Sequence, residues 1–328
     1  MQDPRFLLET SPRQNLHARF AQDVLRGLSA APKRIPSVYF YDSIGSELFE
    51  KICTLPEYYI TRTEKAILET HIHDIARFQN GSDLSLVEFG SGSSYKTRLL
   101  IQAFLQQQGH LTYRPIDISD SILREGARRL LNDFPALRVH ALAAEYDDGI
   151  RKIQQANVSP KILVFLGSNI GNFEPPQAVD FLNKMRHIMQ PRDLLLLGTD
   201  MVKPRHILEP AYDDAQQVTA QFNLNLLRRI NRELGGDFDL SRFRHRAFFN
   251  ETESRIEMHI ESIGQQQAHI AALDRTFAFR AGETIHTENS YKFTPDMLQS
   301  IFAAAGLKRL QHWQDADGYF RLNLLGPA

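Results

Sequence analysis

Short apolar runs alternate with amphipathic segments through the middle of the chain. Five runs are predicted to be buried strands, at residues 84–89, 112–116, 138–142, 161–166 and 193–198. The segments between them carry apolar residues at helical spacing, as in 96–106 and 121–132. Strands that alternate with helices are typical of a parallel sheet with crossover helices, so this region is predicted to be a doubly wound α/β fold.

The alternation stops after residue 202. An amphipathic helix is predicted next, because apolar side chains recur at every fourth position and Gly235 follows as a C-cap: Val218, Phe222, Leu226 and Ile230. Residues 246–262 and 269–293 then have patterns typical of strands. This part of the chain is therefore predicted to be an insertion with its own structure.

The last part of the chain returns to the earlier pattern. A helix is predicted at 295–305 and a strand at 319–325, and both could complete the first sheet. We therefore predict two domains. The doubly wound sheet comprises residues 65–202 plus 292–328, and the second domain comprises residues 1–64 plus 203–291.

Composition and charge exclude several partners. The chain has 328 residues, with 38 Lys and Arg against 39 Asp and Glu, a net charge of −1. No overall positive field exists to hold nucleic acid or an anionic membrane, so we expect neither as a partner. The aliphatic runs are short, and the amino terminus lacks the apolar stretch of a secretion signal. We expect a cytoplasmic monomer that acts on a small molecule.

Two common kinds of catalytic site have no support in the sequence. The single cysteine, Cys53, can form neither an internal disulfide nor a thiolate zinc site, which fits a reducing cytoplasm. There is no His-Glu-x-x-His motif, and the segment 167–171 does not place its serine centrally, as a Gly-x-Ser-x-Gly elbow requires. We therefore expect no metal and no hydrolase nucleophile.

A glycine turn follows the first strand of the predicted sheet. Gly90-Ser91-Gly92 lies at the carboxyl end of that strand, where doubly wound folds bind ligands. A dinucleotide fingerprint would have a third glycine where Tyr95 stands, and a phosphate loop would have a glycine immediately before Lys96. The turn therefore predicts a nucleoside ligand without the usual phosphate contacts.

The acids that follow the next strands favour S-adenosylmethionine. Asp117 ends the second strand and is predicted to accept hydrogen bonds from the ribose hydroxyls, while the backbone of 90–93 approaches the methionine part. Glu145 follows the third strand and is expected near the adenine. A tight turn without a ligand would explain the glycines alone, but the order of strand, glycine turn, strand and acid favours the cofactor.

Longer blocks of sequence resemble the histidine-specific Nα-methyltransferase family of ergothioneine biosynthesis. They cover residues 40–49, 55–59, 61–62, 165–172, 197–200, 211–214, 218–223 and 230–234, and the resemblance runs from about residue 33 to the end. It implies a Rossmann-like class I methyltransferase sheet and a substrate-binding domain formed by the N-terminus and the insertion. It also implies trimethylation of the α-amino group of free L-histidine to hercynine.

The resemblance implies a set of substrate-binding residues. Tyr41 and Tyr58 would line the pocket around the amine and imidazole, and Asn172 and Tyr212 would hold the carboxylate and amino group; Tyr41 and Asn172 are the catalytic candidates. The imidazole would be bound by three further residues: Glu288, Ser290 and Met258. Glu288 and Ser290 are two apart, so on a strand they share a face.

The resemblance also implies cofactor-binding residues. Gly90, Lys96 and Asp117 match the family, with Glu145 and Tyr146 at the adenine, where the family commonly has Asp-Phe. Two alternatives stay open: a transferase of the same fold with another amino acid acceptor or an aminoalkyl donor, and a protein that binds S-adenosylmethionine without catalysis.

Overall fold

The computed structural model describes residues 3–11, 16–79 and 83–328 and divides into two compact units. Unit 1 takes in the described residues of Met1–Pro12, together with Ile60–Val202 and Lys292–Ala328. Unit 2 takes in the described residues of Arg13–Tyr59, together with Lys203–Tyr291. The sequence assigned all of 1–64 to the second domain, whereas the structure places both ends of that segment in unit 1.

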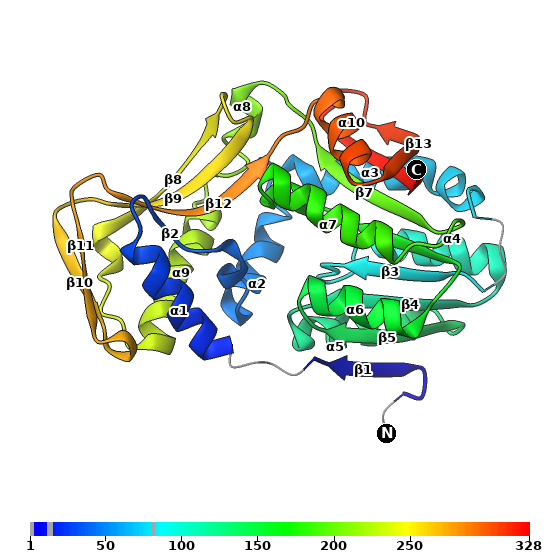
Figure 1. Cartoon of the computed structure of the whole chain (residues 1–328), viewed down its shortest axis with the longest axis horizontal. Coiled ribbons are helices and arrows are strands. Elements are labelled where there is room, and N and C mark those ends of the chain that lie inside the picture. Colours follow the sequence, from blue (N-terminus) through cyan, green and yellow to red (C-terminus); the bar gives the residue numbers. More distant parts are fainter. Residues whose placement is uncertain (1–2, 12–15, 80–82) are drawn as a thin grey trace. The chain divides into compact units, whose positions relative to one another are not determined.

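Unit 1 is built on an eight-stranded sheet in the order β1-β5-β4-β3-β6-β7-β14-β13 (Figure 1). Its strands are β1 (Phe6–Thr10), β3 (Ser85–Phe89), β4 (Leu111–Asp117), β5 (Leu137–Ala143), β6 (Lys161–Phe165), β7 (Leu194–Asp200), β13 (Leu307–Gln314) and β14 (Phe320–Pro327). Among these strands β14 alone runs in the opposite direction to the others, so its pairings with β7 and β13 are antiparallel. The five strands predicted between 84 and 198 are confirmed as β3 to β7.

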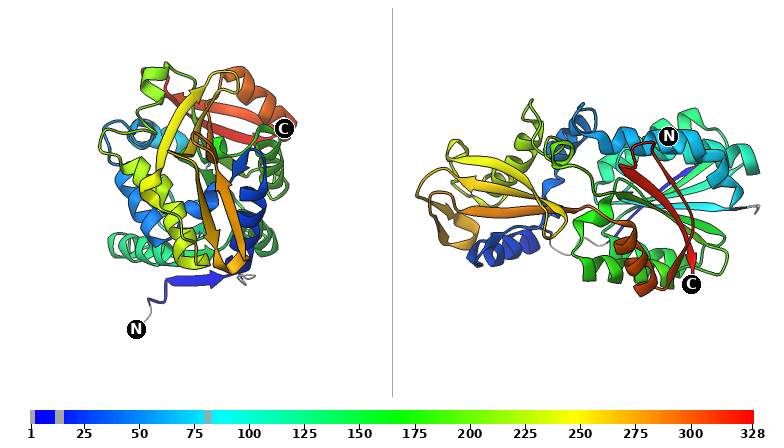
Figure 2. Two further views of the ribbon diagram at one scale, coloured as in Figure 1. Left: turned by 90° about the vertical axis from the view of Figure 1, so that its left-hand side faces the viewer. Right: turned by 90° about the horizontal axis from the view of Figure 1, so that it is seen from above.

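Helices cover both faces of this sheet, as Figure 2 shows in its view from above. They are α3 (Tyr59–Arg77), α4 (Thr97–Gln108), α5 (Asp120–Asp133), α6 (Tyr146–Ala156), α7 (Pro175–His187) and α10 (Pro295–Ala304), with the short 3-10 helix η2 (Asn169–Asn172). All residues of β3 and β6 are buried, as expected for strands covered on both sides. The carboxyl ends of the parallel strands share one edge, and the segments that follow β3 to β6 carry the candidate cofactor residues and Asn172.

Two strands of unit 1 were not predicted, and both lie at an edge of the sheet. Residues 6–10 pair in parallel with β5, and 307–314 pair with β14. Most of their side chains are exposed or half-buried. An edge strand with so few buried positions leaves no apolar run in the sequence, so the pattern there gives no signal.

Unit 2 contains a four-stranded sheet in the order β2-β12-β9-β8 and a two-stranded sheet, β10-β11. The strands are β2 (Lys33–Arg34), β8 (Phe243–Asn250), β9 (Arg255–Ser262), β10 (Gln266–Ile270), β11 (Arg275–Phe279) and β12 (Thr284–Tyr291). The helices are α1 (Leu16–Ser29), α2 (Ser43–Ile52), α8 (Arg205–Leu208) and α9 (Val218–Leu234), with the 3-10 helices η1 (Ser37–Phe40), η3 (Leu240–Arg242) and η4 (Ala271–Leu273).

The long helix predicted after residue 202 is α9, and it packs against β8 and β9. Its stripe of Phe222, Leu226 and Ile230 is buried, and Gly235 ends it in the left-handed conformation. The predicted strand regions are each divided: 246–262 contains parts of β8 and β9, and 269–293 contains parts of β10 to β12. None of the described helices is long and apolar enough to cross a membrane.

Candidate active site

The glycine turn after β3 is tightly closed. Gly90 and Gly92 have φ angles of +69° and +48°, which residues other than glycine rarely adopt. The Gly90 N–H donates to the Ile116 carbonyl at 2.8 Å. A Cβ at Gly90 would lie 2.8 Å from the Tyr146 hydroxyl and 3.1 Å from Asn169 Nδ2, so no larger residue fits. Because these glycines have no side chains, a ligand can approach the backbone of this turn closely.

Asp117 joins this turn to the end of β4. Its Oδ2 accepts the Gly92 N–H and its Oδ1 accepts the Ser119 N–H, both at 3.0 Å. Burial raises the pKa of Asp117, although the backbone N–H groups oppose the rise. Each carboxylate oxygen can accept a further hydrogen bond, so Asp117 can still hold a ligand hydroxyl.

Glu145 and Tyr146 begin α6, directly after β5. Glu145 is half-buried at the N-cap position, and the Tyr146 ring packs among the aromatic rings of four residues: Phe89, Phe165, Phe173 and Phe181. Burial and the charge of Asp117 raise the pKa of Tyr146. The structure thus brings Gly90, Asp117 and Tyr146 together at one edge of the sheet.

Lys96 lies at the start of α4, and its partner was not predicted from the sequence. Its ammonium group pairs with Glu64 of α3, whose side chain is fully buried. The Glu64 carboxylate also accepts the Gly167 N–H, at 2.9 and 3.0 Å to its two oxygens. Glu64 therefore fixes Lys96 beside the segment that follows β6. One signal in the sequence could have identified Glu64: it is an acidic residue on the same apolar face of α3 as Ile67.

Asn172 ends η2, the short helix after β6. It is half-buried, and the part of the chain that the structure describes shows no hydrogen bond to its side-chain amide. The neighbouring helix α7 is capped by Glu174 and Gln177 instead. Asn172 is therefore not needed as a helix cap, and its amide can both donate to and accept from a ligand.

The three candidate tyrosines of unit 2 are linked by aromatic contacts. The Tyr41 ring packs edge-on against Phe49 and Phe222, each with centroids 5.7 Å apart. The Tyr58 ring lies 6.3 Å from Phe49 and 6.2 Å from Tyr212. Phe49 and Phe222 were not predicted as site residues, because helical apolar spacing by itself indicates only core packing.

The strand residues predicted to bind imidazole meet these tyrosines. Ser290 Oγ and the Tyr212 hydroxyl are 2.8 Å apart and buried. Glu288 lies opposite Met258 in the pairing of β12 with β9, next to a register shift. Burial raises the pKa of Tyr58, with smaller contributions from the charges of Tyr212 and Glu288 among others. The structure thus gathers the six candidates that belong to unit 2.

A buried polar network, which was not predicted from the sequence, supports Tyr212. Thr287 donates to Asn223 Oδ1 at 2.8 Å, and Asn223 Nδ2 donates to His245 Nδ1 at 2.8 Å. His245 Nε2 then donates to the Tyr212 carbonyl at 2.8 Å. Burial lowers the pKa of His245, which agrees with a neutral ring whose Nδ1 accepts. The network ties α9, β8 and β12 to the Tyr212 segment.

The order of the sheet, with antiparallel β14 between β7 and β13, and the glycine turn followed by Asp117 are those of an α/β class I methyltransferase fold. Residues 20–327 match the family described as "Histidine-specific methyltransferase, SAM-dependent". The chain belongs to this family.

Individual relatives agree with the family match. The chain is 43% identical to a histidine N-alpha-methyltransferase of Mycolicibacterium smegmatis, over 92% of this chain and 93% of that one. It is 41% identical to a protein of the same name from Mycobacterium tuberculosis, over 94% of this chain and 95% of that one. It is 30% identical to ergothioneine biosynthesis protein 1 of Neurospora crassa, over 90% of this chain but 33% of that longer protein.

Proposed function

We propose that this protein transfers methyl groups from S-adenosylmethionine to the α-amino group of free L-histidine, giving hercynine for ergothioneine biosynthesis. The family match supports the reaction and the substrate. The observation that carries the proposal in the structure is the grouping of Glu288 and Ser290 with the buried tyrosines of unit 2. A carboxylate beside a hydroxyl can pair with both nitrogens of an imidazole.

The residues of unit 1 fit the cofactor. A Cβ at Gly92 would meet no atom within 4 Å, so the turn leaves room beside its backbone for the methionine part. Asp117 would accept from the ribose hydroxyls, and Glu145 and Tyr146 would lie at the adenine. Lys96, held by Glu64, would contribute a positive charge beside Gly167.

Different residues would bind different parts of the histidine molecule. Glu288 and Ser290 would bind the imidazole, with Met258 packed against it. Tyr212 and Asn172 would hold the carboxylate and amino group, and Tyr41 and Tyr58 would line the space around the amine. We infer that unit 2 is the substrate-binding domain.

The bound cofactor supplies an electrophilic methyl carbon on a sulfonium. In each transfer the amine nitrogen would form a bond to that carbon as the carbon–sulfur bond breaks, and S-adenosylhomocysteine would leave. Before each of the three transfers the ammonium form of the amine must lose a proton to water, because only the neutral amine has a lone pair for attack. Tyr58 cannot act as the base near neutral pH, because burial raises its pKa well above the usual value. The protein's main contribution is to align the nitrogen lone pair with the methyl carbon.

This mechanism predicts how the rate depends on pH. With saturating cofactor and subsaturating histidine, the rate should rise by more than about tenfold from pH 7 to pH 9, because the α-amino group of a free amino acid is mostly protonated at pH 7 and only the neutral amine reacts. Initial rates across that range would measure it, with circular dichroism at each pH to show that the protein stays folded. A flat profile would indicate a general base that removes the proton.

The direct test is incubation of the protein with S-adenosylmethionine and a mixture of the proteinogenic amino acids, followed by mass spectrometry. We expect histidine to gain up to three methyl groups. Methylation of another amino acid, or gain of an aminoalkyl group, would support the transferase with a different acceptor or donor. Cofactor binding by calorimetry without any modified amino acid would support the non-catalytic alternative.

Three further properties remain proposals. The reaction requires no metal, because alignment and the sulfonium leaving group are sufficient, so an excess of chelator should leave kcat within about twofold. We propose that the protein is a monomer. The single cysteine fits a cytoplasmic location.

A further inference from the structure

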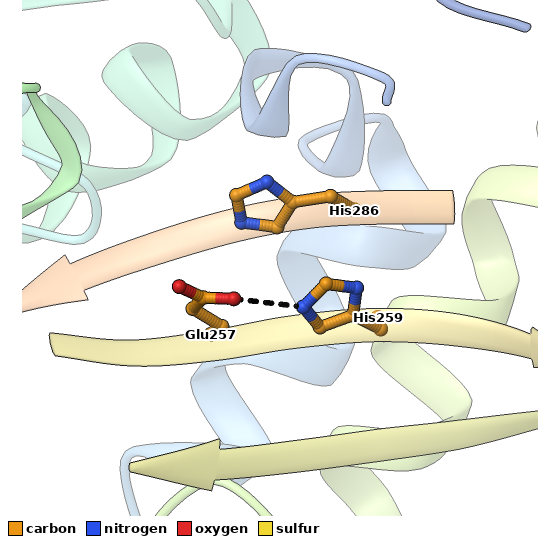
Figure 3. Close-up of side chains that lie close together, drawn as sticks. All are labelled: Glu257, His259 and His286. Atoms are coloured by element: carbon orange, nitrogen blue, oxygen red, sulfur yellow. Dashed lines mark hydrogen bonds and ion pairs between the residues drawn. The ribbon is translucent and has the colours of Figure 1, made fainter. Parts of the chain in front are cut away.

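A second polar cluster in unit 2 lies on the opposite side of the sheet from Met258. Successive strand residues point to opposite faces, so Glu257 and His259 of β9 share a face that Met258 does not. His286 of β12 is paired directly with His259. Figure 3 shows the three side chains on neighbouring strands, and their ligand-type atoms lie within 4.8 Å of one another. We call them the outer-face cluster.

The imidazole rings of this cluster are held in a stack across three strands. Phe248 of β8 lies against His259 with centroids 5.4 Å apart and planes 14° apart. His286 lies on the other side of His259 at 4.8 Å and 19°. The nitrogens of both imidazoles therefore lie at the edge of the stack.

Glu257 has one oxygen anchored and the other directed to His259. Its Oε1 accepts from Asn250 Nδ2 and from Arg255 Nε, both at 2.9 Å. Its Oε2 faces His259 Nε2 at 3.1 Å (Figure 3). Groups that orient a ligating carboxylate through its second oxygen are a common feature of metal sites.

His259 is not fully used by the protein's own hydrogen bonds. Its Nδ1 is buried and has no hydrogen-bond partner within the described ranges of the chain. An internal ion pair with Glu257 therefore does not fully account for this side chain.

The charges around the cluster limit which ions suit it. Arg255 pairs with Glu257, and Arg244 and Arg246 pair with Glu261 on the same strand face. The carboxylate charge is thus largely balanced, which disfavours hard cations such as Mg²⁺ and Ca²⁺ that depend on oxygen ligands. Two imidazoles and one carboxylate suit zinc and similar ions.

We propose that Glu257, His259 and His286 bind a divalent transition metal ion of the zinc class. Glu257 and His259 are two residues apart on β9, and His286 lies directly opposite His259 on β12. This arrangement would place three donors on one side of an ion and leave a fourth position for water. A tetrahedral zinc with bonds of about 2.0–2.1 Å needs its ligand atoms about 3.4 Å apart, closer than the 4.8 Å within which they now lie, so the two imidazole rings must tilt toward each other to bind one ion. The site is separate from methyl transfer, because it faces away from Met258.

Zinc titration of the full chain tests this proposal. The protein would be freed of metal and of any polyhistidine tag, and titrated with ZnCl₂ by calorimetry without histidine, since the free amino acid also binds zinc. We expect one saturable site and no comparable binding of Mg²⁺. His259→Phe and His286→Phe keep a ring in the stack, and each should weaken zinc binding at least tenfold, with the double variant losing it.

The matched control is His269→Phe, which changes a half-buried histidine of β10 in the same unit and should bind zinc as the unchanged protein does. Co²⁺ would be added in parallel, and its visible absorption should disappear in the double variant. Glu257→Gln provides a milder change that should also weaken binding if a phenylalanine variant does not fold. Absence of a saturable site, or equal binding by the double variant, would overturn the proposal. Neither result would affect histidine methylation, which is assayed separately.

Discussion

Replacing Glu288 by alanine should lower kcat/KM for histidine by roughly 10–150-fold, which corresponds to about 1.5–3 kcal/mol for a charged hydrogen bond. In the unchanged protein the Glu288 carboxylate is expected to accept a hydrogen bond from an imidazole N–H, which favours binding of histidine. It also disfavours binding of a side chain that leaves the carboxylate without a partner, because an unpaired charged group in a pocket raises the free energy more than a missing contact does. The substitution removes both effects, so activity toward phenylalanine or tryptophan should fall less, or rise.

A competition assay measures this selectivity directly. Equal concentrations of histidine and tryptophan would be supplied to each protein, and the methylated products counted by mass. Glu253→Ala is a matched control, because it removes an exposed acid in the turn between β8 and β9 of the same unit. If Glu288→Ala keeps the original product ratio, Glu288 does not bind the imidazole and the substrate assignment loses its main structural support.

Replacing Asp117 by alanine should weaken S-adenosylmethionine binding by roughly 10–150-fold, again about 1.5–3 kcal/mol for a charged acceptor. Two losses combine here. The ribose hydroxyls lose their acceptor, and the N–H groups of Gly92 and Ser119 lose the carboxylate that holds the turn. Asp117→Asn keeps an acceptor oxygen without the charge, so its effect should be intermediate.

Calorimetric titration with S-adenosylmethionine would give the dissociation constants, and thermal unfolding would show whether each variant is folded. Asp180→Ala is the control, because Asp180 is an exposed acid on α7 that pairs with Lys184. An unchanged dissociation constant in folded Asp117→Ala would remove Asp117 from the cofactor site.

The strands of the sheet differ in how well the sequence predicts them. The central strands β3 and β6 are buried at every position, so each appears as an apolar run. Residues 6–10 lie at the edge beside β5 and bury little, and their pairing depends on a partner more than 120 residues away. Local pattern contains no information about such a partner. For this reason the first residues were assigned to the wrong unit.

The candidate site shows the same division. The glycine turn and Asp117 were found because each directly follows a predicted strand, and parallel strands bring their ends to one edge. The residues of unit 2 came from the family resemblance, and the structure groups them through Phe49 and the bond from Tyr212 to Ser290. Glu64 was missed, because its partner Gly167 is 103 residues away.

The sequence by itself determined the α/β class, the glycine turn and the family, since these depend on periodicity, on residues that follow predicted strands and on long blocks of similar sequence. Only the tertiary structure decided which distant residues meet. Alternation along β9 places Glu257 and His259 on one face, but the pairing of β9 with β12 puts His286 opposite His259. Strand register is set by the packing and hydrogen bonding of whole elements, and a shift of one residue would turn His286 to the other face.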